Sequence, residues 1–430
     1  MGLIISIEIN GSFFCQLSEN KSNEPISEQF YGIEFDTEVS DSKATRIGNM
    51  EFHRSLPIHS KMRRCVLKDS GEVAYYLNPN NSNLKKNGEP AVLDGSDGQV
   101  MVEIPSFYYK FEEEGTKRRV MFSEKELPGF KLWKKCYVSA YEATIQRSTN
   151  KLSSVVNTSP DYRGGVNDAS RDNTFKSSLG KPASEFRLEQ ARTYARNRGS
   201  DNWKCYLYSI HKMLCWLFVV EYATLNSKLD YTAEKVDGFM SGGLGSGVVD
   251  DDGSVGWNVF DETPFIDCGV TNKLGNSTAV VNIELPRGEY YPPKLASVPS
   301  YRGIENPFGH IFKKLDGVSF KRDGVTVYLS VVEPSEAERS LGYNYPRAEE
   351  GYIKEVVFGE YGDIFPKELV MDYGEYFNSG YAGGFVGDAL LVGGEANTNA
   401  VFAGMFTLMT SGDDSVLETM TGTRLCYIPQ

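Results

Sequence analysis

The sequence predicts an α+β protein in which many short strands surround two helices. Its 430 residues include 25 Tyr, 24 Phe and 42 Gly, a composition typical of turn-rich β structure. Short alternating stretches separated by Gly, Pro, Asn and Asp recur along most of the chain. Only residues 183–198 and 209–226 have the length and apolar pattern of helices. Two neighbouring helices within a long series of short strands indicate the α+β class.

Three regions are expected along the chain. Residues 1–30 predict an N-terminal arm, because apolar and polar residues alternate in IISIEIN and the polar run SENKSNEPISE indicates a linker. Residues 31–112 predict a β-rich domain. Residues 113–430 predict a larger domain that contains both helices.

Hairpins are expected in the β-rich domain. The stretch CVLKDSGEVAYYL alternates on either side of Ser70 and Gly71, which predicts a hairpin with its tip at these residues. The following NPNNSNLKKNGEP predicts a loop. The stretch VLDGSDGQVMVEIPSFYYKFEEEG predicts another strand pair around its Asp-Gly turns. Within it, Val100, Val102 and Ile104 share one face, and Pro105 predicts that the strand ends, bulges or lies on an edge.

Both helices carry end signals. The first is expected over residues 183–198, with Ser184 as its N-cap and Gly199 as its stop. The second is expected over residues 209–226, with Ser209 as its N-cap, and its unbroken apolar run MLCWLFVV predicts burial on nearly all sides. After a glycine-rich loop, the stretches VTVYLSVV, YIKEVVFG, VFAGMFTLM and TRLCYIP predict further strands.

Charge and hydropathy exclude several classes of partner. The formal net charge is −13, which argues against a nucleic-acid partner because phosphate binding needs clustered Lys and Arg. The short basic clusters at 61–64 and 117–119 predict solvated or ion-paired surface features. No apolar stretch approaches the roughly 18 residues of a membrane span, so no membrane insertion is expected. The absence of a charged leader predicts no signal peptide and synthesis in a bacterial cytoplasm.

The sequence contains no recognisable catalytic set. Its four histidines lack metal-ligand spacing, no Ser lies in a G-x-S-x-G turn, and the seven cysteines contain no CxxC pair, which predicts reduced, buried thiols. His211 and Glu221 predict structural roles, as a hydrogen-bonded imidazole and a paired carboxylate. We therefore expect no catalytic residues, no metal ligands, no cofactor and no enzymatic activity. The triple acid Asp250–Asp252 fails the EF-hand pattern and predicts a turn, although a structural calcium ion held by loop oxygens stays an open alternative.

The order of segments carries a family resemblance. The helical stretches SEFRLEQARTYARNRG and SIHKMLCWLFVVEYATLNS are followed by SYRGIENPFGHIFKKLDGV, a glycine-rich final third and GTRLCYIP. This order resembles the C-type-lectin fold in its formylglycine-generating-enzyme-like form, which also occurs in phage tail receptor-binding proteins and in variable proteins of diversity-generating retroelements. Residues 309–314 stand where that family has G-N-x-W-E-W, and residues 422–425 match its closing G-x-R-L strand. The upstream text, including DGSDGQVMVEIPSFYYKF and YVSAYEA, is similar to tail proteins of gut-bacterial phages and prophages.

The resemblance implies a C-type-lectin-like domain, two helices packed on short irregular sheets, over residues 113–430. It covers most of the chain beyond about residue 31. Enzymatic members of the family need a redox-active cysteine pair or a cysteine-bound metal, whereas only Cys426 lies in the final third of this chain. The stretch SYRGIENPFGHIFKKLDGV is interpreted as framework, with Arg302 and Glu305 as a mutual ion pair.

The implied function is that of a tail-fibre or baseplate adhesin in the virion tail, which binds a host cell-surface glycan or protein. Its partners would include other virion tail proteins, and the resemblance implies a homo-oligomer, a trimer, which would multiply avidity. The ligand-binding residues are expected on C-terminal loops, because Tyr offers flat contact area and Asn offers both donor and acceptor. They are Tyr373, Tyr376, Asn378, Tyr381, Asn397 and Asn399. Two alternatives stay open, a purely structural virion subunit and a retroelement-diversified variable protein.

Overall fold

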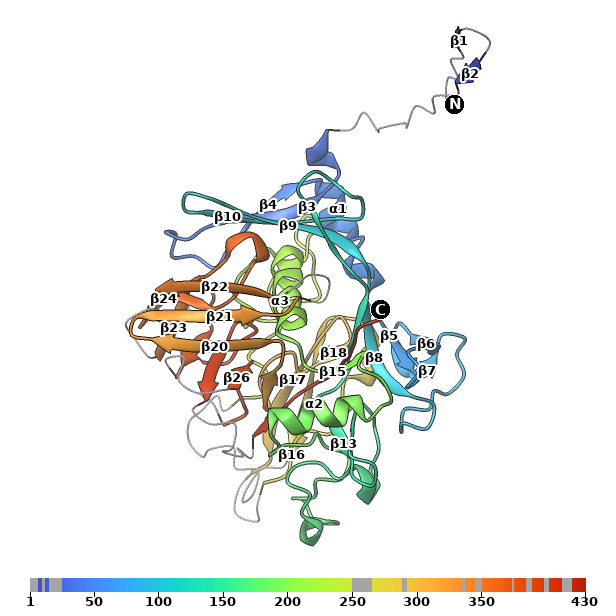
Figure 1. Ribbon diagram of the computed structural model, residues 1–430. Coiled ribbons are helices and arrows are strands. Elements are labelled where there is room, and N and C mark those ends of the chain that lie inside the picture. Colours follow the sequence, from blue (N-terminus) through green and yellow to red (C-terminus); the bar gives the residue numbers. More distant parts are fainter. Residues whose placement is uncertain are drawn as a thin grey trace.

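The computed structural model describes residues 7–9, 12–14, 25–249, 265–287, 292–333, 338–344, 350–372, 375–383, 389–397, 402–411 and 420–430. About 40% of the chain is strand and 13% is helix, which agrees with a β-dominated α+β protein. Several sheets surround the single long helix α3, as Figure 1 shows. The helices are α1 (Met50–Ser55), α2 (Leu188–Arg196) and α3 (Tyr208–Tyr222), with short 3-10 turns at Ile26–Glu28, His59–Lys61, Pro160–Tyr162, Ala169–Arg171, Asn272–Leu274 and Gly359–Tyr361.

A seven-stranded sheet in the order β15-β29-β12-β8-β5-β6-β7 joins distant parts of the chain. Its strands are β5 (Arg63–Leu67), β6 (Val73–Asn78), β7 (Asn81–Lys85), β8 (Gln99–Ile104), β12 (Cys136–Ser139), β15 (Trp203–Cys205) and β29 (Leu425–Tyr427). β29 lies between β12 and β15, so Val138 pairs with Cys426 across most of the length of the sequence.

The two faces of this sheet contact different helices. Along β8, Val100 and Val102 belong to one core cluster and Met101 to another, because successive side chains point to opposite faces. The first cluster contains α3, and the second contains α2. All residues of α3 are buried, as its unbroken apolar run predicts. The helices therefore pack on opposite faces of one sheet.

A five-stranded sheet in the order β11-β9-β10-β3-β4 packs on the first of these cores. Its strands are β3 (Tyr31–Asp36), β4 (Thr45–Gly48), β9 (Phe107–Glu114), β10 (Lys117–Ser123) and β11 (Lys131–Trp133). The boundary expected between residues 112 and 113 falls within β9, and β3 pairs with β10 across it. Residues 31–112 are therefore not a separate unit, because their strands complete sheets and a core that later residues share.

The C-terminal half adds a second seven-stranded sheet, β24-β23-β25-β27-β26-β19-β28, and two three-stranded sheets, β16-β17-β18 and β20-β21-β22. Two further pairs, β13-β14 and β1-β2, stand as separate hairpins. The remaining strands are β1 (Ile7–Ile9), β2 (Ser12–Phe14), β13 (Thr144–Gln146), β14 (Lys151–Ser153), β16 (Ala279–Leu285), β17 (Lys294–Tyr301), β18 (Ile304–Glu305), β19 (Phe312–Leu315), β20 (Val318–Asp323), β21 (Thr326–Val331), β22 (Arg339–Asn344), β23 (Glu350–Val356), β24 (Pro366–Val370), β25 (Gly380–Ala382), β26 (Ala389–Val392), β27 (Leu408–Ser411) and β28 (Thr421–Gly422).

α2 begins later than the sequence predicts. The helix starts at Leu188 rather than near Ser184, and the amide of Arg187 is capped by the Gln190 side chain at 2.9 Å. The backbone at residues 184 and 185 is not helical, because its amides form hydrogen bonds with segments that are distant in the sequence. The amide of Ser184 donates to Gly165 O, and the amide of Glu185 donates to Thr421 O.

α3 begins at Tyr208 and ends at Tyr222, so Ser209 is not its N-cap. The Tyr208 amide donates to Asp316 O at 2.8 Å, which fixes the entry into the helix. At the other end, Ala223 takes a left-handed conformation, and its carbonyl accepts from the Ala44 amide. Contacts with distant backbone therefore set both ends of this helix.

Other expectations about strands need correction. The expected hairpin at Ser70–Gly71 is confirmed by β5 and β6, but the expected loop that follows contains β7. β8 and β9 do not pair with each other, because the chain leaves one sheet at Pro105 and enters another. Of the expected strand VFAGMFTLM at 401–409, only Leu408 and Met409 belong to a strand in the described part of the chain, and that strand, β27, continues to Ser411. Within the described ranges, none of the α-helices has the length and apolar character needed to cross a bilayer.

Gly71 allows the β5–β6 turn to lie against the C-terminal strand. Its φ is +85°, and a Cβ at this position would lie 1.9 Å from the Tyr427 hydroxyl oxygen. We expect Gly71→Ala to lower the free energy of unfolding by about 2 kcal/mol, from backbone strain and overpacking together. Denaturant unfolding measures this loss.

Gly88→Ala is the matched control. Its φ is +92°, but a Cβ there meets nothing within 4 Å. This variant should lose only the backbone contribution, about 1 kcal/mol. Equal losses in both variants would show that the contact with Tyr427 imposes no constraint.

Candidate functional site

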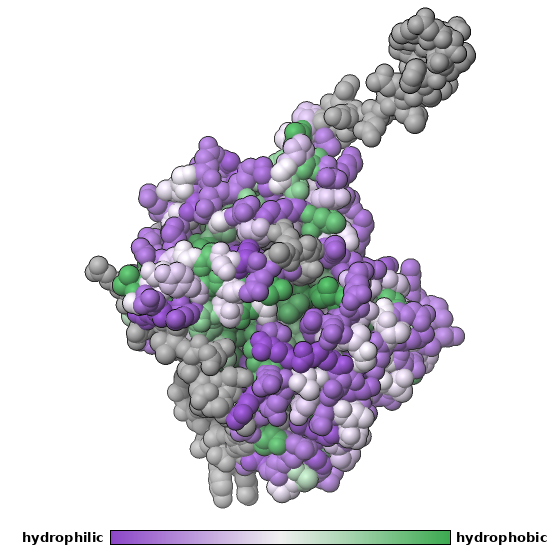
Figure 2. Space-filling model, in the orientation of Figure 1, coloured by the Kyte–Doolittle hydropathy of each residue, from purple (hydrophilic) through white to green (hydrophobic). Residues whose placement is uncertain are grey.

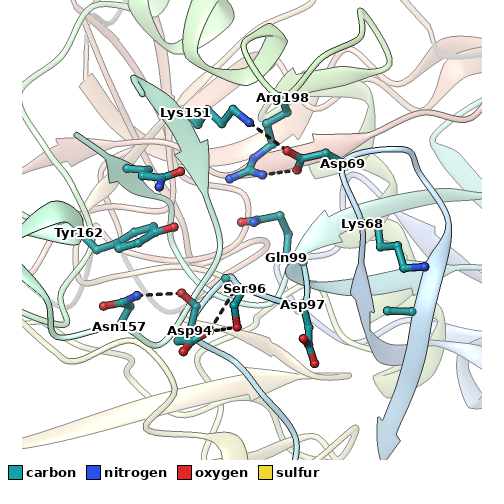
Figure 3. A pocket seen from close by; sticks show the side chains of 14 residues that line it. Lys68, Asp69, Asp94, Ser96, Asp97, Gln99, Lys151, Asn157, Tyr162 and Arg198 are labelled. Carbon is teal, nitrogen blue, oxygen red and sulfur yellow. Dashed lines mark hydrogen bonds and ion pairs between the residues drawn. The ribbon is translucent and has the colours of Figure 1, made fainter. Parts of the chain in front are cut away.

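A polar cleft of about 720 Å³ lies where several distant segments meet. It is bounded by the β5–β6 turn, by the segment that precedes β8 and by the hairpin of β13 and β14 with the segment after it (Figure 3). Its volume falls within the range of small-ligand sites. The cleft is lined by Lys68, Asp69, Ala74, Asp94, Gly95, Ser96, Asp97, Gly98, Gln99, Gln146, Lys151, Asn157, Tyr162 and Arg198.

Gln99, the first residue of β8, has an amide group in this cleft. The side chain is only 2% exposed. Its Oε1 accepts a hydrogen bond from the Ser154 amide at 2.8 Å, which fixes the side-chain orientation. Its Nε2 donates to no group in the described part of the chain, although it carries two N–H donors. A ligand in the cleft could accept from this nitrogen.

Tyr162 places a hydroxyl group in the same space. It is the last residue of the 3-10 turn Pro160–Tyr162 and is 8% exposed. Its ring edge and hydroxyl point into the cleft in Figure 3. Among the residues that the structure describes, none forms a hydrogen bond with this hydroxyl. Gly95 lies next to the Tyr162 hydroxyl, because a Cβ at position 95 would be 3.0 Å from the hydroxyl oxygen.

The charges around the cleft are largely paired. Asp69 contacts Lys151 at 3.1 Å and also pairs with Arg198, whose Nη2 donates to Ser153 Oγ at 2.7 Å. Lys68 contacts Glu72 at 2.9 Å. Three acidic and three basic side chains line the cleft, so its formal charge is balanced.

Two further carboxylates have defined donors. Asp94 accepts from the amide and hydroxyl of Ser96, and these bonds lower the pKa of its carboxyl group. Asp97 accepts from the Tyr75 hydroxyl at 2.8 Å. A carboxylate offers about four acceptor positions, so both groups retain acceptor capacity towards the cleft. The site can thus donate to and accept from one ligand.

The expected ligand-binding residues lie elsewhere. Tyr373 and Asn399 fall outside the described residues. The four others do not line the cleft. Tyr376 and Tyr381 are 8% and 1% exposed, respectively, and the Tyr381 hydroxyl lies 3.3 Å from Thr410 Oγ1.

These two tyrosines therefore belong to the core and not to an exposed loop surface, because β25 carries the Tyr381 ring inward. Asn378 is half-buried and Asn397 is exposed. Among the described members of the expected set, only Asn397 is exposed.

A buried ionic cluster lies beneath the stretch at 309–314. Glu142 pairs with Lys313 at 2.9 Å and also accepts from His310 Nδ1. His310 Nε2 accepts from the Ile266 amide at 2.9 Å, so the proton of this imidazole is on Nδ1. Burial raises the pKa of Glu142, but Lys313, His310 and Arg424 together outweigh this effect and the pKa falls to about 2. Burial lowers the pKa of Lys313 to about 8.

The stretch at 300–318 behaves as framework, since residues 300–315 are buried except for half-buried Arg302. The expected pair of Arg302 with Glu305 is wrong. Arg302 Nε instead donates to Glu221 at 3.0 Å, and this confirms Glu221 as a paired carboxylate. The Glu305 carboxylate instead accepts hydrogen bonds from the backbone amides of Gly269 and Thr271, which are uncharged donors.

Two arginines are buried completely within this framework. Arg64 donates to Gly303 O at 2.6 Å and to Asn272 Oδ1 at 2.8 Å, so this member of the basic cluster at 61–64 is not a surface residue. Arg424 donates to the carbonyls of residues 305, 306 and 139. The closing strand is thereby joined to the stretch SYRGIEN.

His211 and the cysteines that the structure describes are buried. His211 is confirmed as a hydrogen-bonded imidazole, with Tyr206 Oη at 3.1 Å and Met405 O at 2.9 Å. Six of the seven cysteines are described, and each is free and buried. Burial raises the pKa of Cys426 to about 12, which disfavours its thiolate. The described residues contain no group of three or more His, Cys, Asp or Glu arranged to hold a metal, and Asp250–Asp252 fall outside them.

A shallower hollow of about 440 Å³ lies on the outward face of the sheet β20-β21-β22. Tyr328 is exposed there, while Val327, Leu329 and Val331 of the same strand point into the core. Figure 2 shows that hydrophilic side chains cover most of this side of the molecule, with hydrophobic ones near its middle. Unlike the cleft, this hollow is lined by no buried polar residue, since Leu329 is the one buried member of its lining.

Sequence reasoning missed the cleft. The stretch DGSDG at 94–98 was recognisable as a turn, and its two carboxylates were a signal for a polar surface. Nothing local distinguishes Gln99 or Tyr162, because their place in the cleft depends on which distant segments meet. No protein-family model matches the chain, and no curated protein matches it.

Proposed function

We propose that this chain is a phage or prophage tail-associated adhesin, a tail-fibre or baseplate protein that binds a host cell-surface ligand. The observation that carries the proposal is the polar cleft, in which Gln99 and Tyr162 present hydrogen-bonding groups that the described protein leaves unused. Such groups gain bonds only when a ligand or water meets them. The cleft is built on strands and paired charges, so its shape is preorganised for binding.

We propose the C-type-lectin-like form for the part of the chain that contains α2 and α3. Two features support it. β29 pairs with β12, so the two ends of the segment between residues 136 and 427 lie side by side. Arg424 of GTRL contacts the backbone of SYRGIEN, so two stretches that carry the family resemblance meet in the core.

The proposal extends to partners. Host glycan or protein would be the ligand, and other virion tail proteins would hold the adhesin on the particle. A homotrimer would present several copies of one weak site, and simultaneous engagement would raise avidity without new contacts. The exposed Asn397 remains a proposed contact on the C-terminal loops.

The test uses the full chain. A fragment of residues 113–430 would cut β9 in two and would lose β5, β6, β7 and β8 from the seven-stranded sheet that contains β29. Fluorescently labelled protein is added to a panel of gut-bacterial strains, and bound signal is measured by flow cytometry. Saturable binding to at least one strain, abolished by excess unlabelled protein, is expected. Binding to no strain above the competed level would contradict the adhesin function and favour a structural virion subunit.

A further inference from the structure

We propose that the polar cleft is a binding site for a neutral saccharide, with Gln99 and Tyr162 contacting it from the floor and Asp94 and Asp97 accepting from its hydroxyl groups. This assignment rests on the proposed adhesin function and names its ligand class. It is argued from the hydrogen-bonding capacity, the charge balance and the shape of the cleft.

The first argument is hydrogen-bonding capacity. Gln99 Nε2 can only donate, the carboxylates of Asp94 and Asp97 can only accept, and the Tyr162 hydroxyl can do both. Saccharide hydroxyl groups also donate and accept together, so one sugar can satisfy all of these groups. Gln99 and Tyr162 are more than nine-tenths buried as residues, and Gln99 Nε2 and the Tyr162 hydroxyl have no partner in the described structure, so a bound sugar would supply bonds that the protein does not make.

The second argument is charge. An anionic ligand needs unpaired cations, but Lys151 and Arg198 both contact Asp69. A cation needs several carboxylates free to converge on it. Asp69 is committed to those two bases, while Asp94 and Asp97 are held by Ser96 and Tyr75, respectively. The balanced charge of the lining therefore favours a neutral ligand.

The third argument is shape. The cleft is open to solvent and about 720 Å³ in volume, so it can admit an internal unit or an end of a longer chain. Its wall includes Ala74 and the Tyr162 ring, which offer apolar surface to the C–H groups of a sugar. Gln99 lies on β8, and Gln146 and Lys151 lie on the hairpin of β13 and β14, so strands carry part of this lining.

The test begins with the full-length wild-type protein on an array of neutral oligosaccharides built from glucose, galactose, mannose, rhamnose, N-acetylglucosamine and N-acetylgalactosamine. Polysialic acid and heparin serve as anionic probes. Binding to at least one neutral oligosaccharide is expected, and its affinity is then measured by isothermal titration calorimetry.

Two variants locate the site. Tyr162→Phe removes a hydroxyl that has no partner among the described residues, so it should weaken binding about tenfold and leave Tm unchanged. Gln99→Glu keeps the acceptor for the Ser154 amide but replaces the donor towards the cleft, and it should weaken binding by at least as much. Tyr328→Phe, on the outward face of β21, is the matched control and should bind as the wild type does.

Three outcomes would overturn the assignment of the cleft to a neutral saccharide. They are binding to no neutral oligosaccharide, binding only to the anionic probes, and wild-type affinity in Tyr162→Phe. Cell binding separates this failure from failure of the adhesin proposal. If cells bind wild type and Tyr162→Phe equally, the cleft assignment is wrong and the adhesin stands. If sugars bind as expected but no strain is bound, the adhesin proposal is wrong and the cleft assignment stands.

Discussion

Arg424→Met is expected to lower the free energy of unfolding by about 3 kcal/mol, because it leaves buried carbonyl oxygens without a hydrogen-bond donor. The guanidinium of Arg424 donates to Asn306 O at 2.6 Å, to Ser139 O at 3.3 Å and to Glu305 O. Methionine fills a similar volume but donates nothing. Urea unfolding followed by tryptophan fluorescence and circular dichroism measures the loss.

Arg196→Met is the control for this variant, because Arg196 is exposed in the last turn of α2. It should change stability by less than about 0.5 kcal/mol. If Arg424→Met were as stable as the wild type, the bonds of Arg424 would contribute no more than an apolar contact, and the joining role assigned to this residue would be wrong.

Glu142→Gln should lower the free energy of unfolding at pH 7 by about 3 kcal/mol, and the difference from wild type should shrink as the pH falls from 5 to 2. The pKa of Glu142 is depressed from an ordinary 4.5 to about 2, so its contribution to stability is complete above pH 4.5. It is lost as acid protonates the folded carboxylate. The wild type therefore loses this contribution in acid, whereas the variant never has it.

Denaturant unfolding of both proteins at pH 7, 5, 4 and 3 measures this convergence. Glu189→Gln on the exposed face of α2 is the matched control, and its small difference from wild type should stay constant across this range. A constant difference for Glu142→Gln would contradict the assigned ionic contact with Lys313.

The helix α3 illustrates what the sequence could predict. Its unbroken apolar run predicted a buried helix, and all its residues are buried. The ends were less predictable, because the Asp316 carbonyl and the residues around Ser42 and Ala44 fix them from distant parts of the chain. Local signals such as Ser209 report a preference, and tertiary hydrogen bonds can override it.

Strand pairing was predictable only where a tight turn joins the partners. The turn at Gly71 identified β5 and β6, whereas the Asp-Gly turns before β8 did not reveal that β5 and β12 would be its neighbours. The expected boundary at 112–113 failed for the same reason. Turn residues specify a reversal of the chain, but the partner strand depends on packing across the whole molecule.

The ligand-binding prediction shows a further limit. Tyr has a large apolar ring and one hydroxyl, so the same residue suits a binding surface or a core. Tyr381 is in the core with its hydroxyl near Thr410, and Tyr162 presents its hydroxyl to a cleft. Arg64 is a similar case, because a short basic cluster gave no indication that one member would be buried.

The position of β29 has a consequence for biosynthesis. β12 and β15 can both be complete while the ribosome is still making the next 200 residues or so, yet the strand that joins them is Leu425–Tyr427. Until that strand emerges, both flanking strands keep an unpaired edge, which is a template for association with other nascent chains. Truncated or slowly translated products should therefore depend on chaperones to stay monomeric during synthesis.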